Sequence, residues 1–336
     1  MSLPVRSIAS TEVEVSVLGL GTAALGNLYR AVTDETAEAT TRAALAAGIG
    51  YIDTAPHYGQ GLSERRLGQA LHGRPATLST KVGRVLHPIS PPPPPGTVRH
   101  GFVDGDAFEP AFDYSYDGVM RSFAASRQRL GEAPVAILLA HDLGALTHGA
   151  ASGAHMRDFL DGGFSAMAEL KAAGQVQAVG LGVNEWQVAE EVLAACDLDV
   201  VLLAGRYTLL EQTALDSFLP LCQRRGVSVI AGGPFNSGIL AGDIHYDYDV
   251  APPAIVARVK AIEAVCTAHG VTLAAAALHF PLTHPAVACV LAGMASPDQV
   301  EANLALWRTE IPPALWDDLK TAGLLHGDTP ALPAVA

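Results

Sequence analysis

Residues 51–59 read Tyr51-Ile52-Asp53-Thr54-Ala55-Pro56-His57-Tyr58-Gly59, and they pass from a buried strand into a turn. Tyr51 and Ile52 are typical of a strand, whereas a carboxylate such as Asp53 is costly to bury without a partner. Pro56 and Gly59 end the strand and leave Tyr58 in the turn. A carboxylate and a tyrosine at the end of one apolar strand indicate a functional site.

Two further apolar stretches end in a charged or titratable residue. Residues 76–83 form a predicted strand that finishes at Lys81, and residues 135–142 form one that finishes at His141. If these strands are parallel neighbours, their carboxyl ends meet at one edge of the sheet. The sequence therefore predicts that four side chains converge there: Asp53, Tyr58, Lys81 and His141.

Strand and helix patterns alternate along the whole chain, which predicts a parallel α/β fold. Short apolar strands begin near residues 17, 50, 77, 135, 176, 200, 227 and 287. Helices are predicted over residues 33–47, 63–71, 115–130, 164–173, 186–195, 213–225, 253–269, 273–280, 297–307 and 313–322. Eight such units favour a single (β/α)8 TIM barrel over residues 1–336, with a doubly wound open sheet as the alternative. Residues 5–16 alternate like an N-terminal β-hairpin.

One connection is unusually long. Residues 84–114 separate the third strand from its helix and include a proline run over 91–95, which favours an extended conformation. Connections of this length in a compact domain are usually lids, binding loops or disordered. Because the segment leaves the carboxyl end of a strand, we expect a lid or substrate loop, with a passive insertion as the alternative.

Composition limits the class of protein. The 336 residues are 49% hydrophobic and 16% charged, which is typical of a chain with a large buried core. A formal charge of −13 argues against binding to nucleic acid or anionic membranes. Four cysteines without CxxC spacing predict buried, reduced thiols, and neither a signal peptide nor a membrane-spanning run is evident, so we expect a cytoplasmic protein.

The convergent residues suit acid–base chemistry without a metal or a covalent nucleophile. A nearby ammonium lowers the pKa of a tyrosine, so Lys81 would assist Tyr58, and Asp53 would hold Lys81. His141 would hydrogen-bond the substrate oxygen. His57 directly precedes Tyr58, so we expect it to contact substrate as well. Such a centre fits carbonyl–alcohol interconversion by hydride transfer, which requires a cofactor. Taken singly, each residue has a structural explanation; their joint placement carries the prediction.

The chain resembles aldo-keto reductases over almost its full length. The resemblance rests on residues 19–23, Asp53 to Ala55 with Tyr58-Gly59, Lys81, His141-Asp142, residues 182–184, residues 238–240, Gly293, residues 297–300 and Asn303. It implies that Asp53, Tyr58, Lys81 and His141 form a catalytic tetrad, and that a nicotinamide cofactor lies across the barrel mouth.

The resemblance also implies a set of cofactor-binding residues: Gly21, Thr22, Asp53, Asn184, Tyr207, Pro234, Phe235, Gly238, Gly293, Ser296, Gln299 and Asn303. Three positions depart from the family pattern around the nicotinamide. Val183 replaces a serine and Ala204 a glutamine, and Gly232 replaces the aromatic residue that stacks on the ring. Residues 293–299 contain no Lys or Arg, so we expect NAD to be preferred, with NADP as the alternative.

Within the family, residues 112–122 and 202–210 resemble the branch of D-threo-aldose 1-dehydrogenase, L-fucose dehydrogenase and pyridoxal 4-dehydrogenase. That likeness implies oxidation of a small cyclic hemiacetal to a lactone, first of an L-fucose or D-threo-aldose type sugar at C1. The alternatives are pyridoxal oxidation to 4-pyridoxolactone and general aldehyde or ketone reduction. From other classes, a Schiff-base lyase using Lys81 and a nucleotide-sensing barrel stay open, as does the oligomeric state.

Overall fold

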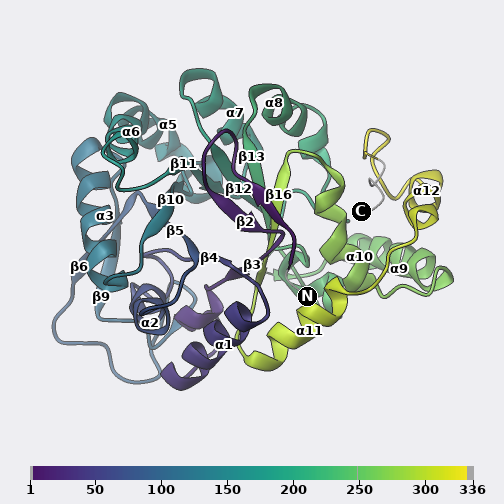
Figure 1. Ribbon diagram of the computed structural model, residues 1–336, viewed down its shortest axis with the longest axis horizontal. Helices are drawn as coiled ribbons and strands as arrows, with labels where there is room; N and C mark the ends of the chain where they lie inside the picture. The colour runs from purple at the N-terminus through teal and green to yellow at the C-terminus, as the bar shows by residue number, and fades with distance from the viewer. Residues whose placement is uncertain (1–2, 248, 331–336) are drawn as a thin grey trace.

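A closed barrel of eight parallel strands forms the centre of the computed structural model, which describes residues 3–247 and 249–330 (Figure 1). The sheet closes because β5 pairs with β10 and β16 pairs with β3. This confirms the predicted (β/α)8 barrel and excludes the open sheet. The strands are β3 (Leu18–Gly21), β4 (Tyr51–Asp53), β5 (Thr77–Val82), β10 (Val135–His141), β11 (Ala178–Val183), β12 (Val200–Ala204), β13 (Ser228–Gly232) and β16 (Val287–Gly293).

Helices surround the barrel, and the first of them shows how the sequence fixes their starts. Thr33 caps α1 by accepting a hydrogen bond from the Thr36 amide, with Asp34 and Glu35 in the first turn. The main helices are α1 (Asp34–Ala46), α2 (Leu62–Ala70), α3 (Tyr116–Leu130), α6 (Phe164–Ala172), α7 (Trp186–Ala195), α8 (Phe218–Arg225), α9 (Pro253–Ala268), α10 (Leu273–His279), α11 (Pro297–Trp307) and α12 (Pro313–Thr321).

Two helical regions differ from the sequence prediction. Residues 213–225 split into a short 3-10 turn, η4 (Thr213–Leu215), and α8, because Pro220 belongs in the first turn of a helix. An unpredicted helical run precedes α6: α4 (Ala145–His148), η2 (Gly149–Ala151), α5 (Ser152–Asp158) and η3 (Phe159–Gly163). Among the described residues no single helix is long and apolar enough to cross a membrane; one pair, bent by 95°, passes that test jointly.

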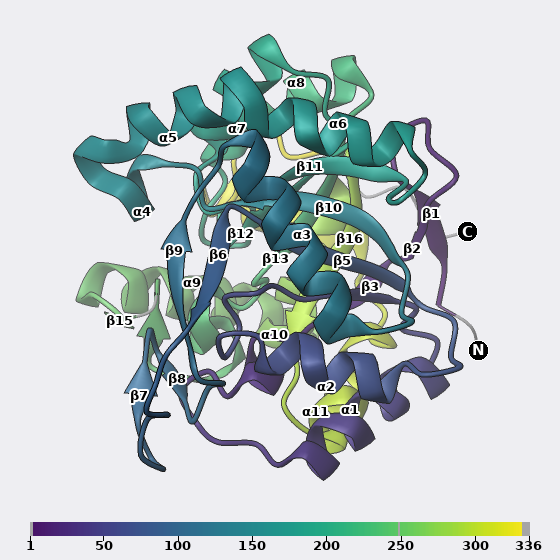
Figure 2. The same cartoon turned by 90° about the vertical axis from the view of Figure 1, so that its left-hand side faces the viewer.

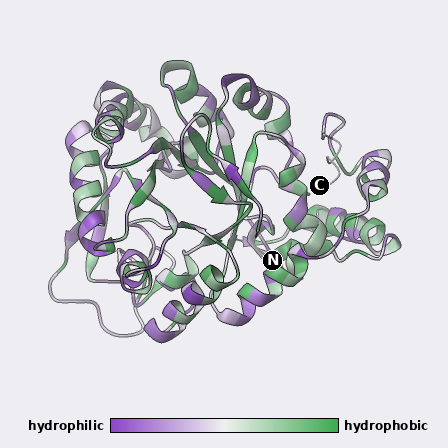
Figure 3. Cartoon of the chain, in the orientation of Figure 1, coloured by the Kyte–Doolittle hydropathy of each residue, from purple (hydrophilic) through white to green (hydrophobic). Residues whose placement is uncertain are grey.

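Apolar side chains form two cores, and the barrel strands carry most of the hydrophobic colour in Figure 3. The larger core lies between the sheet and the helices, and the smaller one fills the barrel interior. The predicted N-terminal hairpin is present as β1 (Val5–Ser7) and β2 (Glu14–Ser16). Its residues Ile8, Val13 and Val15 join the interior core, and the four cysteines are free and buried, as predicted.

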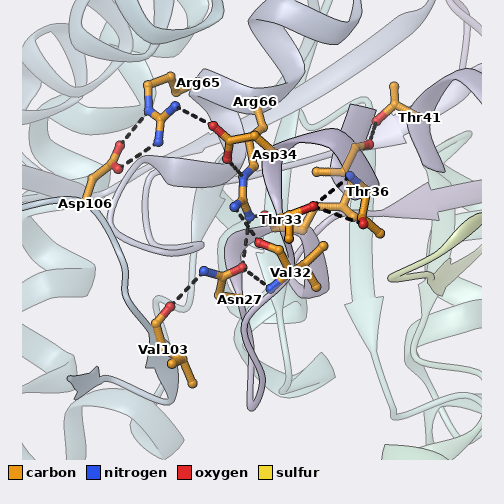
Figure 4. A network of polar contacts seen from close by, with 12 residues as sticks. Asn27, Val32, Thr33, Asp34, Thr36, Thr41, Arg65, Arg66, Val103 and Asp106 are labelled. Carbon is orange, nitrogen blue, oxygen red and sulfur yellow. Dashed lines mark hydrogen bonds and ion pairs between the residues drawn. The ribbon is translucent and has the colours of Figure 1, made fainter. Parts of the chain in front are cut away.

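The segment after β5 consists of two antiparallel ribbons rather than irregular loop. Strand β6 (Arg84–Pro88) pairs with β9 (Phe108–Phe112), and β7 (Val98–Arg99) pairs with β8 (Phe102–Val103); both ribbons lie on the left in Figure 2. Neighbouring segments hold the ribbon of β7 and β8, which we call the far ribbon, and the residues that follow it in place. Asn27 donates a hydrogen bond to the Val103 carbonyl at 2.9 Å, and Arg65 pairs with Asp106 at 3.1 Å (Figure 4).

Candidate active site

The carboxyl ends of three adjacent strands bring the predicted residues together. Strand β5 lies between β4 and β10, so Lys81 is flanked by Asp53 and His141. The Lys81 ammonium donates three hydrogen bonds, to Asp53 Oδ2 at 2.6 Å, to the Thr54 carbonyl at 2.9 Å and to Tyr58 Oη at 3.1 Å. Every proton of this ammonium therefore has an acceptor, one of which is the tyrosine.

The environment keeps Lys81 charged. Burial lowers the pKa of Lys81, but the Asp53 carboxylate and the Tyr58 hydroxyl raise it by more, so it lies above its ordinary value. The second carboxylate oxygen of Asp53 accepts a hydrogen bond from Ser79 Oγ at 2.7 Å. Both oxygens of this fully buried carboxylate are thus engaged, which fixes its orientation.

Tyr58 is placed by a turn that only glycines allow. Gly59 has a φ of +65°, and a Cβ there would collide with the carbonyl oxygen of Gly26. A Cβ on Gly26 would in turn lie 2.6 Å from the Tyr58 carbonyl carbon, so both positions require glycine. Burial raises the pKa of Tyr58 above its ordinary value, and the Lys81 ammonium opposes that rise.

His141 faces the tyrosine edge to face. The two ring centres are 6.0 Å apart with the planes at 87°. Burial, reinforced by the nearby Arg84 and Lys81 cations, lowers the pKa of His141 well below its ordinary value, so the imidazole is neutral near pH 7. Tyr114 fixes the backbone behind it, because its hydroxyl donates to the His141 carbonyl at 2.5 Å.

Two cavities open at this end of the barrel and share a wall formed by Ala23, Tyr58, Leu202 and Ala204. We call the first the glycine-rich cavity; it is bounded by Gly21, Gly205, Gly232, Gly233, Gly293 and Asp247, among others. We call the second the aromatic cavity; its rings are Tyr29, His57, Tyr58, His100, Phe102 and His141. The Tyr58 side chain therefore faces both cavities.

The glycine-rich cavity fits a dinucleotide in one respect that the structure tests directly. Gly293 lines it, and a Cβ on Gly293 would meet no atom within 4 Å, so the missing side chain leaves open space. Four of the predicted cofactor residues line this cavity: Gly21, Thr22, Asp53 and Gly293.

The other predicted cofactor residues lie elsewhere around the mouth. Asn184 lines the aromatic cavity. Pro234 and Phe235 directly precede η5 (Asn236–Ala241), and Gly238 lies within it. Ser296 is the N-cap of α11, Gln299 lies in its first turn and Asn303 in its middle. Tyr207 is the exception, because its side chain is buried, packs on Phe280 with ring centres 5.0 Å apart and bonds Thr283 through its hydroxyl. The structure does not bring Tyr207 to either cavity.

Sequence reasoning did not find several residues that the structure places at the site. Arg84 pairs with Asp142 at 2.5 Å, and Asp247 lines the glycine-rich cavity, where it pairs with Arg206. His100 and Phe102 reach the aromatic cavity from the far ribbon of the inserted segment. Only Asp142 had a usable signal, because it directly follows the histidine at the end of β10.

Comparison with known proteins identifies the family to which the chain belongs. Residues 17–323 match the model of the Aldo/keto reductase family. The chain belongs to the aldo/keto reductase family. It is 44% identical to a pyridoxal 4-dehydrogenase of Microbacterium luteolum over 95% of this chain and 97% of that protein. It is 37% identical to a D-threo-aldose 1-dehydrogenase of a Pseudomonas species, covering 97% and 99% of the two chains. This family member is an NAD(P)-dependent oxidoreductase acting on a small molecule.

A solved aldo-keto reductase from Bacillus halodurans shares the fold, with a TM-score of 0.74 at 24% identity over 97% of this chain and 98% of that one.

Proposed function

We propose that this reductase-family chain oxidises the carbon of a cyclic hemiacetal to a lactone with NAD. The observation that carries the proposal is the 3.1 Å contact between Lys81 Nζ and Tyr58 Oη on the wall shared by the two cavities. A tyrosine placed there reaches a substrate on one side and a cofactor on the other. The hemiacetal class is the one that the sequence resemblance implies, and the two relatives named above, a pyridoxal 4-dehydrogenase and a D-threo-aldose 1-dehydrogenase, support it.

In the oxidation direction, Tyr58 acts as the base. A bound nicotinamide supplies the acceptor for the hydride that leaves the hemiacetal carbon. The hydroxyl proton on that carbon passes to Tyr58 Oη, and Lys81 stabilises the phenolate that accepts it. Neutral His141 hydrogen-bonds the same substrate oxygen as it becomes a carbonyl. In reduction the proton moves in the opposite direction.

We assign the cofactor to the glycine-rich cavity, with its nicotinamide end extending past the shared wall to Asn184, which lines the aromatic cavity. NAD is favoured over NADP because residues 293–299 carry no Lys or Arg to bind a 2′-phosphate. Arg206, the nearby cation that would otherwise serve, is paired with Asp247 at 3.0 Å and also donates to the Asn184 carbonyl at 2.9 Å.

We assign the substrate to the aromatic cavity, with pyridoxal as the first candidate and an aldose as the second. Six rings around the cavity suit a flat pyridine ring, and the pyridoxal relative is the more similar of the two named. An L-fucose or D-threo-aldose type sugar is the second candidate, supported by the D-threo-aldose relative. We assign the inserted segment the role of a substrate wall, since His100 and Phe102 come from its far ribbon.

A Schiff-base mechanism at Lys81 is disfavoured by its surroundings. An amine nucleophile must lose its proton, whereas Lys81 has a raised pKa and donates to three acceptors. Borohydride trapping with pyridoxal or L-fucose should accordingly give no covalent adduct at Lys81.

The decisive experiment follows reduced-nicotinamide absorbance with pyridoxal, L-fucose and an open-chain aldehyde, and identifies the product by mass. We expect NAD⁺-dependent lactone formation, and we expect Tyr58→Phe to lower turnover by roughly 10²-fold or more while NAD still binds. Wild-type turnover in Tyr58→Phe, or activity confined to reducing open-chain aldehydes, would contradict the proposal. Binding of NAD without turnover of any substrate would favour a sensor.

A further inference from the structure

Asp142 is an acidic residue of the site that the proposed mechanism does not use. It directly follows His141 at the end of β10 and lines the aromatic cavity. Its φ is +52°, a left-handed conformation that Asp and Asn adopt more readily than most residues. Its amide donates to the Gly182 carbonyl at 2.9 Å, so the backbone is tied to the neighbouring strand β11.

The Asp142 carboxylate joins residues from three elements. Oδ2 accepts a hydrogen bond from Arg84 at 2.5 Å and lies 3.4 Å from His141 Nε2. Oδ1 accepts one from the side-chain amide of Asn184 at 3.3 Å. Arg84 begins β6, and its guanidinium lies over the Phe112 ring at 4.6 Å, so the cation that balances Asp142 is itself held by the inserted segment.

Asn184 is the residue for which this contact matters. The serine and glutamine expected beside it are Val183 and Ala204, neither of which has a polar side chain. Its carbonyl accepts from Arg206 at 2.9 Å, and its side-chain nitrogen donates to Asp142. Asn184 is therefore fixed at both ends by charged residues, and its amide oxygen is left to accept a hydrogen bond from a ligand amide.

We propose that Asp142 is a positioning residue that orients Asn184 toward the nicotinamide amide, in place of the missing serine and glutamine. This inference rests on the proposed function, since it assumes a nicotinamide cofactor. Two other roles for Asp142 give different results in the test below: a direct contact with substrate, and a purely structural ion pair with Arg84.

The test compares two ligands that differ only in the nicotinamide. NAD⁺ and ADP-ribose are titrated by calorimetry into the wild-type chain and into Asp142→Asn. We expect Asp142→Asn to weaken NAD⁺ on the order of 10-fold, the scale of one hydrogen bond to a charged group, and to leave ADP-ribose unchanged. Asn184→Ala should give the same loss, and the double variant should lose no more than either single one.

Asp199→Asn is the matched control. Asp199 is also buried and paired, to Lys171 at 2.7 Å, but it precedes β12 at the opposite end of the barrel. Asp199→Asn should bind both NAD⁺ and ADP-ribose with the affinity of the wild-type chain. If Asp142→Asn fails to fold because Arg84 is left unpaired, Arg84→Gln with Asp142→Asn removes both charges and takes its place in the same comparison.

Three results would overturn the inference. An equal loss for both ligands would mean a structural role, and unchanged NAD⁺ affinity with a raised KM would mean a substrate contact. A further loss in the double variant would mean that Asp142 acts independently of Asn184. Failure of the proposed function would show in a different protein, the wild-type chain. If the wild-type chain binds neither ligand, the proposed function is wrong, whereas the three results above concern the variants and overturn only the role of Asp142.

Discussion

The ammonium of Lys81 lies 3.1 Å from the hydroxyl of Tyr58 and 4.6 Å from the centre of its ring. Burial raises the pKa of Tyr58, and this ammonium acts in the opposite direction. The contact therefore determines how alkaline the solution must be before Tyr58 accepts a proton, and it gives the first prediction.

Replacing Lys81 by Met should move the pH dependence of oxidation toward alkaline pH. The phenolate is the active form in this direction, so turnover rises as pH rises through the pKa of Tyr58. Without the cation the pKa of Tyr58 is higher. We therefore expect the rising limb of log kcat against pH to move to higher pH by roughly one pH unit or more.

Because Lys81→Met leaves Asp53 buried without its cation, Asp53→Asn with Lys81→Met is the control for folding. A limb at the wild-type pH in both variants would contradict the role of Lys81.

Phe102 provides a test of the inserted segment. Its side chain is buried, and its ring centre lies 5.3 Å from that of His57 in the wall of the aromatic cavity. Phe102→Ala should raise the KM for the best substrate on the order of 10-fold, because an aromatic contact is lost, while NAD⁺ affinity stays unchanged. Steady-state kinetics and calorimetry measure the two quantities.

Val98→Ala, an exposed position in the same ribbon, is the matched control and should change neither. Equal KM values for Phe102→Ala and the wild-type chain would show that the segment does not contact substrate.

The barrel and its strand-end residues were predictable because each signal is local. Asp53 and His141 each end a strand and Lys81 lies one residue before the end of another, and parallel strands bring their ends together whatever lies between them. The Arg84–Asp142 pair was not predictable in this way. Its members are 58 residues apart, and it is the pairing of β5 with β10 that places β6, which directly follows β5, beside the end of β10.

The missed ribbons and helices have physical reasons as well. Strands β6 and β9 contain Pro88 and Pro110 and bury no residue except Arg84, so they lack the alternation of buried apolar residues that marks a strand. The helical run over residues 145–163 contains four glycines, which weaken helix propensity. Burial of Phe159 and Met156 against the core stabilises these turns, and a tertiary contact of this kind leaves no local pattern.

Histidine 284 should make stability depend on pH. His284 is buried, burial lowers its pKa to about 4, and its Nδ1 accepts a hydrogen bond from the Ala286 amide at 3.2 Å. The unfolded chain therefore binds a proton below about pH 6.5 that the folded chain does not bind until about pH 4. Stability from this group is complete above the unfolded pKa and is lost as pH falls toward the folded one.

His284→Asn should remove this dependence, since Asn can still accept from the Ala286 amide. Between about pH 8 and pH 5 we expect the free energy of unfolding to fall by about 2 kcal/mol less than in the wild-type chain. Urea unfolding at the two pH values measures this free energy for both proteins. An equal fall in the free energy of unfolding in the two proteins would refute the prediction.

Gln299 is the position from which cofactor choice can be changed. It lies in the first turn of α11, where its backbone amide donates to Ser296 Oγ at 3.3 Å and its side-chain oxygen accepts from the Ala295 amide at 2.7 Å. Its side chain thus stabilises the loop that follows β16 but brings no charge to it. In the wild-type chain we expect a higher specificity constant for NAD⁺ than for NADP⁺, and the reverse order would show that a cation from elsewhere reaches the 2′-phosphate.

Gln299→Arg adds the missing cation at that position. A guanidinium can bind a phosphate through two hydrogen bonds, so the ratio of specificity constants should move toward NADP⁺ on the order of 10-fold, mainly through a lower KM for NADP⁺. Gln299→Leu is the matched control, because it removes the same hydrogen bond to Ala295 without adding a charge. It should weaken both cofactors to a similar degree. A shift toward NADP⁺ in Gln299→Leu would mean that the loop conformation, and not the charge, decides between the cofactors.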